Sequence, residues 1–221
     1  MQRTRSAILF LSLIVLIIVS ASPGCSPTLE PGIDEALLIV SHSTYVDRYG
    51  YFHMVGEVQN VGKCSTTDNW VSVTFYDEEG LSSVAGSGPC FKEIMAPSEK
   101  SPFEIILPKA PEHVNCSLTT QWQATEMQPI GQMVIEEISS TIDTEGQYVV
   151  TGRIVNGGSQ AVEYAMVFST LYDSLGKVVA VAFGFADDSP IGVGNSSSFA
   201  IFTDPSVSFE IDHFVLECQT P

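Results

Sequence analysis

The sequence predicts an all-β protein of two tandem β-sandwich domains behind an N-terminal export signal. Three observations lead to this prediction. The chain repeats itself at a spacing of 96 residues, each copy carries two turn motifs of the form Asp-x-x-Gly, and the flanking segments are rich in β-branched and aromatic residues. No stretch after the signal shows a helical hydrophobic period. These features together favour strands joined by tight turns.

The composition supports packed cores and excludes one class of partner. Of the 221 residues, 44% are hydrophobic and 10% are aromatic, which is sufficient for ordinary globular domains. The chain carries 26 Asp and Glu against 9 Lys and Arg, a formal net charge of −17. Because such a surface repels phosphate backbones, we expect no nucleic acid partner.

Residues 1–24 form a predicted export signal. Arg3 and Arg5 precede a run from Ala7 to Ala21 that is apolar except for two serines. A charged start, an apolar stretch and a small-residue end are typical of such signals. The apolar run is short for a membrane span, which needs about 20 residues. Export would place the protein on the extracellular or periplasmic side of a membrane.

Cys25 is the candidate site of a membrane anchor. The segment Ser22-Pro23-Gly24-Cys25 resembles a bacterial lipoprotein signal at Gly24 and Cys25, where the cysteine takes lipid and becomes the mature N-terminus. It departs from that pattern at Ser22 and Pro23. We expect a lipid at Cys25, and cleavage without lipidation or a retained signal anchor remain open alternatives. Residues 25–34 then form a linker.

The rest of the chain consists of two copies of one unit, predicted as domains over residues 35–125 and 126–221. One shift of 96 residues, applied without gaps from Leu37 to Leu107, matches many residues of the first copy to the second. A unit of this length is a domain and is too long for a solenoid repeat. The identical pairs include Gly56 and Gly152, Asn60 and Asn156, Tyr76 and Tyr172, and Phe103 and Phe199.

Each copy carries two Asp-x-x-Gly motifs, which predict hairpin turns. The aspartate at the first position of a turn accepts hydrogen bonds from the backbone beyond it, and the glycine at the fourth takes a positive φ. Each motif therefore marks the tip of a β-hairpin. The turn residues are Asp47, Gly50, Asp77, Gly80, Asp143, Gly146, Asp173 and Gly176.

The segments between these turns predict about six strands in each copy. Some alternate between apolar and polar residues and others are continuously apolar, as expected when some strands are half-exposed and others lie between sheets. Short strands at this spacing favour a two-sheet, immunoglobulin-like sandwich. The expected strands are 36–45, 51–60, 69–76, 81–87, 102–107 and 113–121, then 132–141, 147–155, 164–172, 177–185, 198–203 and 211–218.

The segment FSTLYD in the second copy resembles the FxLYD domain family. The first copy reads VTFYD and has Phe75 where the family prefers leucine. The resemblance covers both copies, including GEVQN and GRIVN. It implies an exported or membrane-anchored β-rich module and supplies no catalytic residue. The family positions are Phe168, Leu171, Tyr172 and Asp173 in the second copy, and Tyr76 and Asp77 in the first.

Five cysteines raise the question of disulfides, which export permits. If Cys25 takes lipid, four remain. Around the second turn of the first copy, Cys90 falls opposite the loop that holds Cys64, which predicts a Cys64–Cys90 bridge. Cys116 and Cys218 both fall in the last strand region of their copies. They predict a second bridge between the domains, with two buried free thiols as the alternative.

No motif predicts catalysis, a cofactor or a metal. The four histidines are scattered, and neither a zinc-protease helix motif, a nucleophile elbow nor a phosphate-binding loop is present. We therefore expect a protein that is not an enzyme and needs no cofactor.

The combined features predict a non-catalytic cell-envelope protein, a lipid-anchored binding or spacer module with an unidentified protein or glycan partner. An accessory subunit of an envelope complex is the alternative, and an enzyme or metal-binding protein is a third reading. Function in sandwiches resides in the end loops. The candidate loops are 61–69, 88–100, 157–163 and 186–196, with Trp70, Phe91, Asp187 and Asp188 in or beside them.

Lipidation at Cys25 can be tested by intact mass spectrometry of the protein purified from its native membrane. We expect a chain that begins at Cys25 and carries added acyl mass, because the thiol is the acceptor in lipoprotein processing. The Cys25→Ala variant should lose that mass and its membrane attachment. A chain that retains residues 1–24, or a mature chain without acyl mass, contradicts the lipid anchor.

Overall fold

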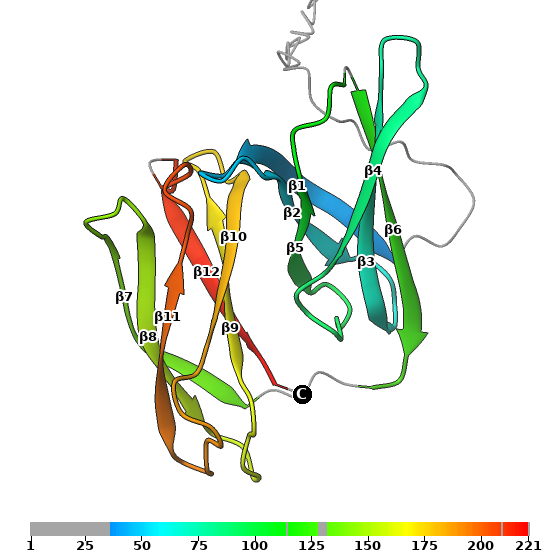
Figure 1. Ribbon diagram of the computed structural model, residues 1–221. Coiled ribbons are helices and arrows are strands. Elements are labelled where there is room, and N and C mark those ends of the chain that lie inside the picture. The colour runs from blue at the N-terminus through cyan, green and yellow to red at the C-terminus, as the bar shows by residue number, and fades with distance from the viewer. Residues whose placement is uncertain (1–35, 114, 128–131, 209, 221) are drawn as a thin grey trace, which may run out of the picture.

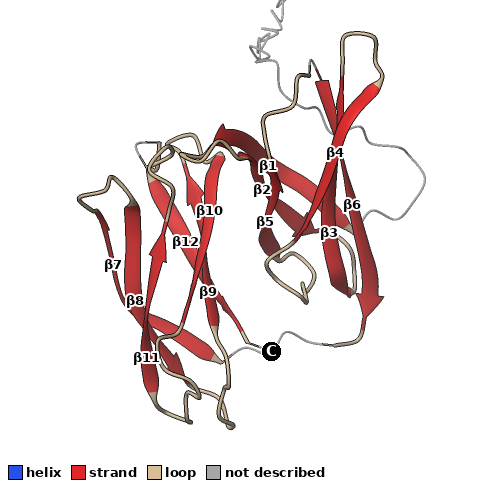
Figure 2. Cartoon of the chain, viewed as in Figure 1, coloured by secondary structure: helices blue, strands red, loops and turns tan. Residues whose placement is uncertain are grey.

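The computed structural model describes residues 36–113, 115–127, 132–208 and 210–220, so the predictions for the signal, Cys25 and the linker lie outside the described residues. Within these ranges the chain forms strands and turns and no α-helix, which confirms the all-β prediction (Figure 2). In the same ranges, no helix could cross a membrane.

Twelve strands form four antiparallel sheets of three strands each (Figure 1). The first half contributes sheets β1-β2-β5 and β4-β3-β6, and the second contributes β11-β8-β7 and β10-β9-β12. The strands are β1 (Leu37–Val46), β2 (Phe52–Asn60), β3 (Ser65–Tyr76), β4 (Ser82–Pro89), β5 (Lys100–Leu107), β6 (Asn115–Thr125), β7 (Met133–Ile142), β8 (Tyr148–Asn156), β9 (Met166–Tyr172), β10 (Val178–Phe185), β11 (Ser196–Phe202) and β12 (His213–Gln219).

The 96-residue repeat is visible in the strands themselves, since β1, β2, β4 and β5 each begin 96 residues before β7, β8, β10 and β11. We call β1–β6 the first sandwich and β7–β12 the second. Each has a hydrophobic core of its own. Phe75 and Phe103 lie at the centre of the first core, and their counterparts Leu171 and Phe199 occupy the second.

All four Asp-x-x-Gly motifs form the predicted hairpin turns. In each, the aspartate Oδ1 accepts hydrogen bonds from the backbone N–H groups two and four residues later, at 2.8–3.0 Å. The fourth-position glycines have φ between +77° and +89°. This backbone conformation is strained for a residue with a Cβ, which explains why glycine recurs there.

The repeated asparagine after β2 and β8 has a structural role that the sequence did not explain. The buried Asn60 Nδ2 donates to the carbonyl oxygens of Cys64 at 2.9 Å and Met95 at 2.8 Å. This side chain therefore ties the turn after β2 to the loop before β5. The corresponding bonds of the second sandwich run from Asn156 to Gln160 and Ile191.

The predicted Cys64–Cys90 disulfide is wrong, because both cysteines are free thiols. The simple hairpin register places Cys90 opposite residue 67. The turn instead pairs Asp77 with Leu81, which moves the register by one position, and a register shift at Phe75 and Tyr76 moves it by another. Cys90 therefore lies opposite Asn69, whose carbonyl oxygen accepts from the Cys90 N–H at 2.8 Å. Cys90 thus lies five positions from Cys64 along the neighbouring strand and points into the first core.

The predicted Cys116–Cys218 disulfide is also wrong, because Cys218 is a free thiol. Cys116 is buried in the first core, whereas Cys218 packs against the second. Each side chain faces the interior of its own sandwich, so the two sulfurs cannot meet.

Two corresponding positions have the same positive φ, but only one of them is a glycine, so they allow a matched test of stability. Ser98 has a φ of +72°, and its counterpart Gly194 has a φ of +73°. We expect Ser98→Gly to raise the free energy of unfolding by about 0.5–1 kcal/mol, because a Cβ is unfavourable in the left-handed region. Gly194→Ser should lower it by a similar amount. Urea denaturation measures both, and a loss of stability in Ser98→Gly contradicts the explanation.

Candidate functional site

The two sandwiches meet over the outer face of sheet β10-β9-β12. Along β9, Val167 and Leu171 point into the second core, and the alternate residues Phe168, Thr170 and Tyr172 point to the other face. These outward residues are nevertheless only 0%, 2% and 9% exposed. The first sandwich covers them, and an apolar cluster forms there from Val55, Tyr172, Val178 and Val181, with Tyr45 and Phe91 packed against it.

A buried carboxylate lies at the centre of this interface. Glu57 on β2 accepts a hydrogen bond from the Tyr172 hydroxyl at 2.7 Å and pairs with the Lys100 ammonium at 2.6 Å. The Tyr172 ring stacks on His213, with ring centroids 5.0 Å apart. Burial of the phenol and its bond to the Glu57 carboxylate raise the pKa of Tyr172 well above its ordinary value. Tyr172 therefore acts as a neutral hydrogen-bond donor that links the sandwiches.

The matching tyrosine of the first copy has a different environment. Tyr76 shares a hydrogen bond of 3.2 Å with the Ser117 hydroxyl and is partly exposed. The counterpart of Glu57 in the second sandwich is Arg153, which pairs with Glu136 and Glu137. The motif is thus repeated in sequence, but only Tyr172 contacts the other sandwich.

Polar contacts at the edge of β10 reinforce the interface. The Ser43 hydroxyl donates to the Val178 carbonyl oxygen at 2.6 Å, and the Val178 N–H donates to the Ser41 hydroxyl at 3.1 Å. Arg48 lies 3.7 Å from the Asp204 carboxylate. The first part of the free edge of β10 is therefore occupied by β1.

A histidine lies between two carboxylates near the same interface. His53 Nδ1 is 2.8 Å from Glu104, its Nε2 is 3.4 Å from Asp47, and its ring stacks on Tyr45 with centroids 4.6 Å apart. Burial disfavours the charged imidazole, but the two carboxylates outweigh it and raise the pKa of His53 above 6.5. These ion pairs stabilise the fold below pH 6.5 and weaken as the pH rises through the shifted pKa. Among the described residues, no group of His, Cys, Asp and Glu side chains is arranged as a metal site.

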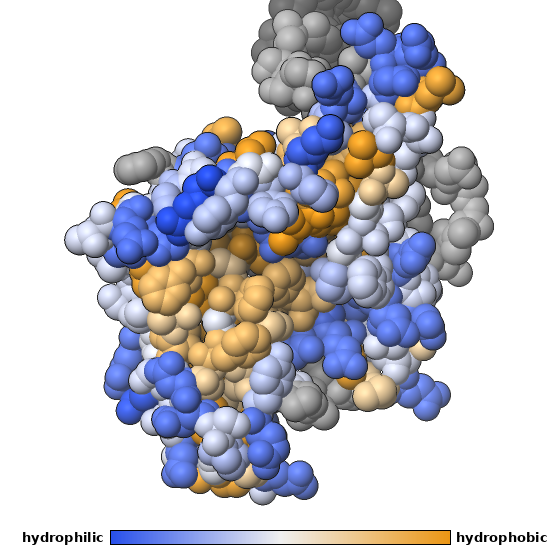
Figure 3. Space-filling model, viewed as in Figure 1, coloured by the Kyte–Doolittle hydropathy of each residue, from blue (hydrophilic) through white to orange (hydrophobic). Residues whose placement is uncertain are grey.

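Four aromatic rings run along the uncovered part of the interface face. Phe91 contacts Phe183, Phe183 contacts Phe185, and Phe185 contacts Tyr164, with centroid separations of 5.9, 5.7 and 5.4 Å. Phe183, Phe185 and Tyr164 are 46–47% exposed. We call these four residues the aromatic strip. Figure 3 shows a broad hydrophobic area over β10 and its neighbouring strands.

The first sandwich does without these rings. Under the 96-residue shift, Phe183 corresponds to Ser87, Phe185 to Pro89 and Tyr164 to Asp68. Since the first copy has the same fold without them, the exposed aromatic side chains are not required by the sandwich. They are a specialised feature of the second copy.

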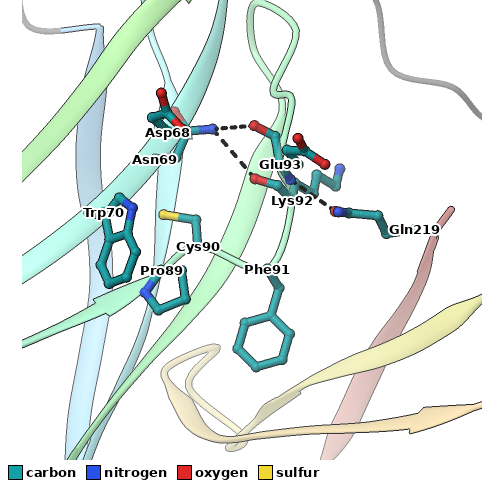
Figure 4. A pocket seen from close by; sticks show the side chains of 9 residues that line it. All are labelled: Asp68, Asn69, Trp70, Pro89, Cys90, Phe91, Lys92, Glu93 and Gln219. Atoms are coloured by element: carbon teal, nitrogen blue, oxygen red, sulfur yellow. Dashed lines mark hydrogen bonds between the residues drawn. The ribbon is translucent and has the colours of Figure 1, made fainter. Parts of the chain in front are cut away.

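A small pocket of about 180 Å³ adjoins the strip at Phe91. Figure 4 shows Trp70 and Phe91 on either side of Pro89 and Cys90. Burial raises the pKa of the Cys90 thiol to about 12, which makes it a poor nucleophile. Its side chain forms part of the pocket wall. The remaining lining residues are Asp68, Asn69, Lys92, Glu93 and Gln219, the last of them from the second sandwich.

An irregularity in β3 shapes this pocket. The register between β3 and β6 shifts between Thr67 and Trp70, and Asp68 has a φ of +50°. Such bulges re-aim side chains and are frequent beside functional sites. The buried Asn69 Nδ2 lies 3.2 Å from the Glu93 carbonyl oxygen, while its Oδ1 has no hydrogen-bond partner.

The loop that carries Phe91 is held by the second sandwich. The Lys92 ammonium pairs with Glu217 at 2.5 Å and lies 3.7 Å from Glu99. The Glu93 N–H donates to Gln219 Oε1 at 2.9 Å. Phe91 packs on the fully buried Phe168, with centroids 5.7 Å apart. The pocket is thus formed by both sandwiches.

The structure brings some of the predicted residues together and separates others. Trp70 and Phe91, from two candidate loops, line one pocket. Asp188 lines a different hollow with Pro190 and Asn195, and Asp187 lines neither of the two. Sequence reasoning missed Phe183, Phe185 and Tyr164. A comparison of the two copies at these positions would have found them.

The chain matches no protein-family model and no curated protein.

The role of Tyr172 can be tested against Tyr76. We expect Tyr172→Phe to lower the free energy of unfolding by about 1.5–3 kcal/mol, because it removes a bond to a buried carboxylate. Tyr76→Phe should cost about 0.5–1 kcal/mol, since its bond is neutral and partly exposed. Urea denaturation compares the two variants. Equal losses contradict the assignment of Tyr172 to the interface.

Proposed function

We propose that this protein is a non-catalytic binding module of the cell envelope, anchored through lipid at Cys25, that presents the aromatic strip to a partner outside the membrane. We also propose that its two copies are immunoglobulin-like domains of the FxLYD family. The observation that carries the functional proposal is the row of half-exposed rings in the second sandwich, at positions where the first has Ser87, Pro89 and Asp68.

Physical considerations favour a binding role for the strip. Exposure of aromatic rings to water is unfavourable in free energy. A contiguous exposed apolar surface is therefore rare on a protein, except where that surface binds a partner. Aromatic residues also dominate the energetics of interfaces, because a ring buries a large area and loses little side-chain entropy. A ring such as Phe183, 47% exposed, still has apolar surface to bury against a partner.

The mutual packing of the rings favours a protein partner over a flat sugar-stacking platform. Phe183 and Phe185 pack edge to face at 77°, and Tyr164 is tilted by 38° against Phe185. Their faces therefore do not share a plane. An uneven apolar surface of this kind suits interdigitating side chains.

The first sandwich then serves as support and spacer. Phe91 is the one ring of the strip that it supplies, and the contacts of Tyr172, Lys92 and Gln219 hold that ring in place. A tether at Cys25 would place the first sandwich between the membrane and most of the strip.

The proposal can be tested by capture from the native envelope with the immobilised protein. Wild-type protein should retain a specific partner, and the double variant Phe183→Ser, Phe185→Ser should lose it, because the apolar contact area is removed. Leu175→Ser is the matched control, since Leu175 is 91% exposed at a hairpin tip outside the strip.

Circular dichroism establishes that each variant is folded before capture. A partner that both serine variants retain equally contradicts the proposal, as does the absence of any partner for folded wild-type protein.

A further inference from the structure

We propose that the pocket between Trp70 and Phe91 binds a lysine-type ammonium group of a partner polypeptide, and that the aromatic strip holds apolar side chains next to that lysine. This inference rests on the proposed function and names the chemistry of its partner. It follows from the groups that line the pocket, the charges around it and its continuity with the strip.

The hydrogen-bond donors of Phe91 and Lys92, in the loop that lines the pocket, are already used within the protein. The Phe91 N–H donates to the Pro102 carbonyl oxygen at 2.9 Å. The Lys92 N–H donates to the Ser101 hydroxyl at 2.9 Å, and its ammonium pairs with Glu217. These two backbone N–H groups are therefore not free to bind an anion.

Acceptors, in contrast, remain available. The carboxylates of Asp68 and Glu93 form no ion pair among the described residues, and both residues are exposed. Asn69 Oδ1 has no hydrogen-bond partner either, but this oxygen is buried, so the two exposed carboxylates are the acceptors that a ligand can reach. The exposed carboxylates therefore favour a ligand that donates hydrogen bonds and carries a positive charge, as an ammonium group does.

The charge around the pocket also favours a positively charged ligand. Four carboxylates and one ammonium, that of Lys92, lie at or beside the pocket, which gives a local charge of −3 within a chain of net charge −17. The field attracts cations to this part of the surface. The carboxylates are those of Asp68, Glu93, Glu99 and Glu217.

The pocket walls suit a cation on an apolar stem. Trp70 is 42% exposed and presents an indole, the ring type that attracts cations most strongly. A volume of about 180 Å³ is small for a whole drug-sized ligand and suits one side chain. Phe91 and Pro89 can cover the methylene groups of a lysine.

The strip determines that the cation is part of a polypeptide. Phe91 lines the pocket and contacts Phe183, so the apolar surface continues directly from the cation site. A free diamine would leave the strip uncovered. A second copy of this chain is disfavoured, because two surfaces of net charge −17 repel each other.

The test uses peptide titration monitored by Trp70 fluorescence in a Trp122→Phe background, which leaves Trp70 as the single tryptophan. The probe is a capped pentapeptide in which two lysines alternate with leucine and phenylalanine. Its control has both lysines acetylated. We expect the acetylated peptide to bind about ten-fold or more weakly, and binding of the lysine peptide to weaken as salt increases.

Variants separate the two parts of the site. Asp68→Asn and Glu93→Gln should each weaken binding about three-fold, whereas Glu145→Gln, at a remote hairpin tip, removes the same charge and should have little effect. Phe183→Ser should weaken binding of the lysine peptide about five- to ten-fold and leave the affinity for 1,5-diaminopentane unchanged.

Three results overturn the inference. The first is that the acetylated peptide binds as tightly as the lysine peptide. The second is that the diamine binds and Phe183→Ser leaves the affinity for the lysine peptide unchanged. The third is that an oligosaccharide such as a glucose tetramer binds and the lysine peptide does not. If envelope capture still depends on Phe183 and Phe185 in these cases, the ligand chemistry is wrong and the binding function remains.

Discussion

The arrangement of this molecule depends on a buried carboxylate, Glu57, shared between two sandwiches. A carboxylate in that position is unfavourable unless it is paired and hydrogen-bonded. Lys100 supplies the pair from the same sandwich, and Tyr172 supplies the hydrogen bond from the other. Docking removes Glu57 from water, and the Tyr172 hydroxyl replaces a hydrogen bond that water would otherwise supply. The relative position of the sandwiches is therefore coupled to the electrostatics of one side chain, and the strip and pocket depend on that position.

The two copies have diverged so that they complement each other. Glu57 corresponds to Arg153 and Phe91 to Asp187, so the second sandwich lacks the surface that the first uses for docking. In the other direction, Phe168 corresponds to Ser72, and the outer face of the first sandwich lacks the buried ring. Because each copy carries only one of the two complementary faces, the pair closes on itself. Further copies have no matching surface for a continued head-to-tail assembly.

The packing of the two sandwiches against each other also explains which aromatic rings are left exposed at the candidate site. The interface covers Phe168 and Tyr172 completely or nearly so, and it leaves Phe183, Phe185 and Tyr164 half-exposed at its margin. The loop that carries Phe91 connects the covered part with the uncovered part, because its ring contacts both Phe168 and Phe183. The strained Asp68 beside Trp70 belongs to the same region. Backbone strain and exposed rings both oppose stability, and their concentration in one place is typical of a binding surface.

The sequence alone determined the features that depend on neighbouring residues. The four Asp-x-x-Gly turns, the all-β class and the repeat follow from local turn chemistry, β propensity and a constant spacing, and strand ranges were predicted to within a few residues. Only the tertiary structure decided the state of Cys64, Cys90 and Cys218, because register shifts of one or two residues change which side chains meet. It also decided the partner of Tyr172, 115 positions away in the chain. Pairing at that separation depends on the shapes of two folded surfaces, which local pattern does not encode.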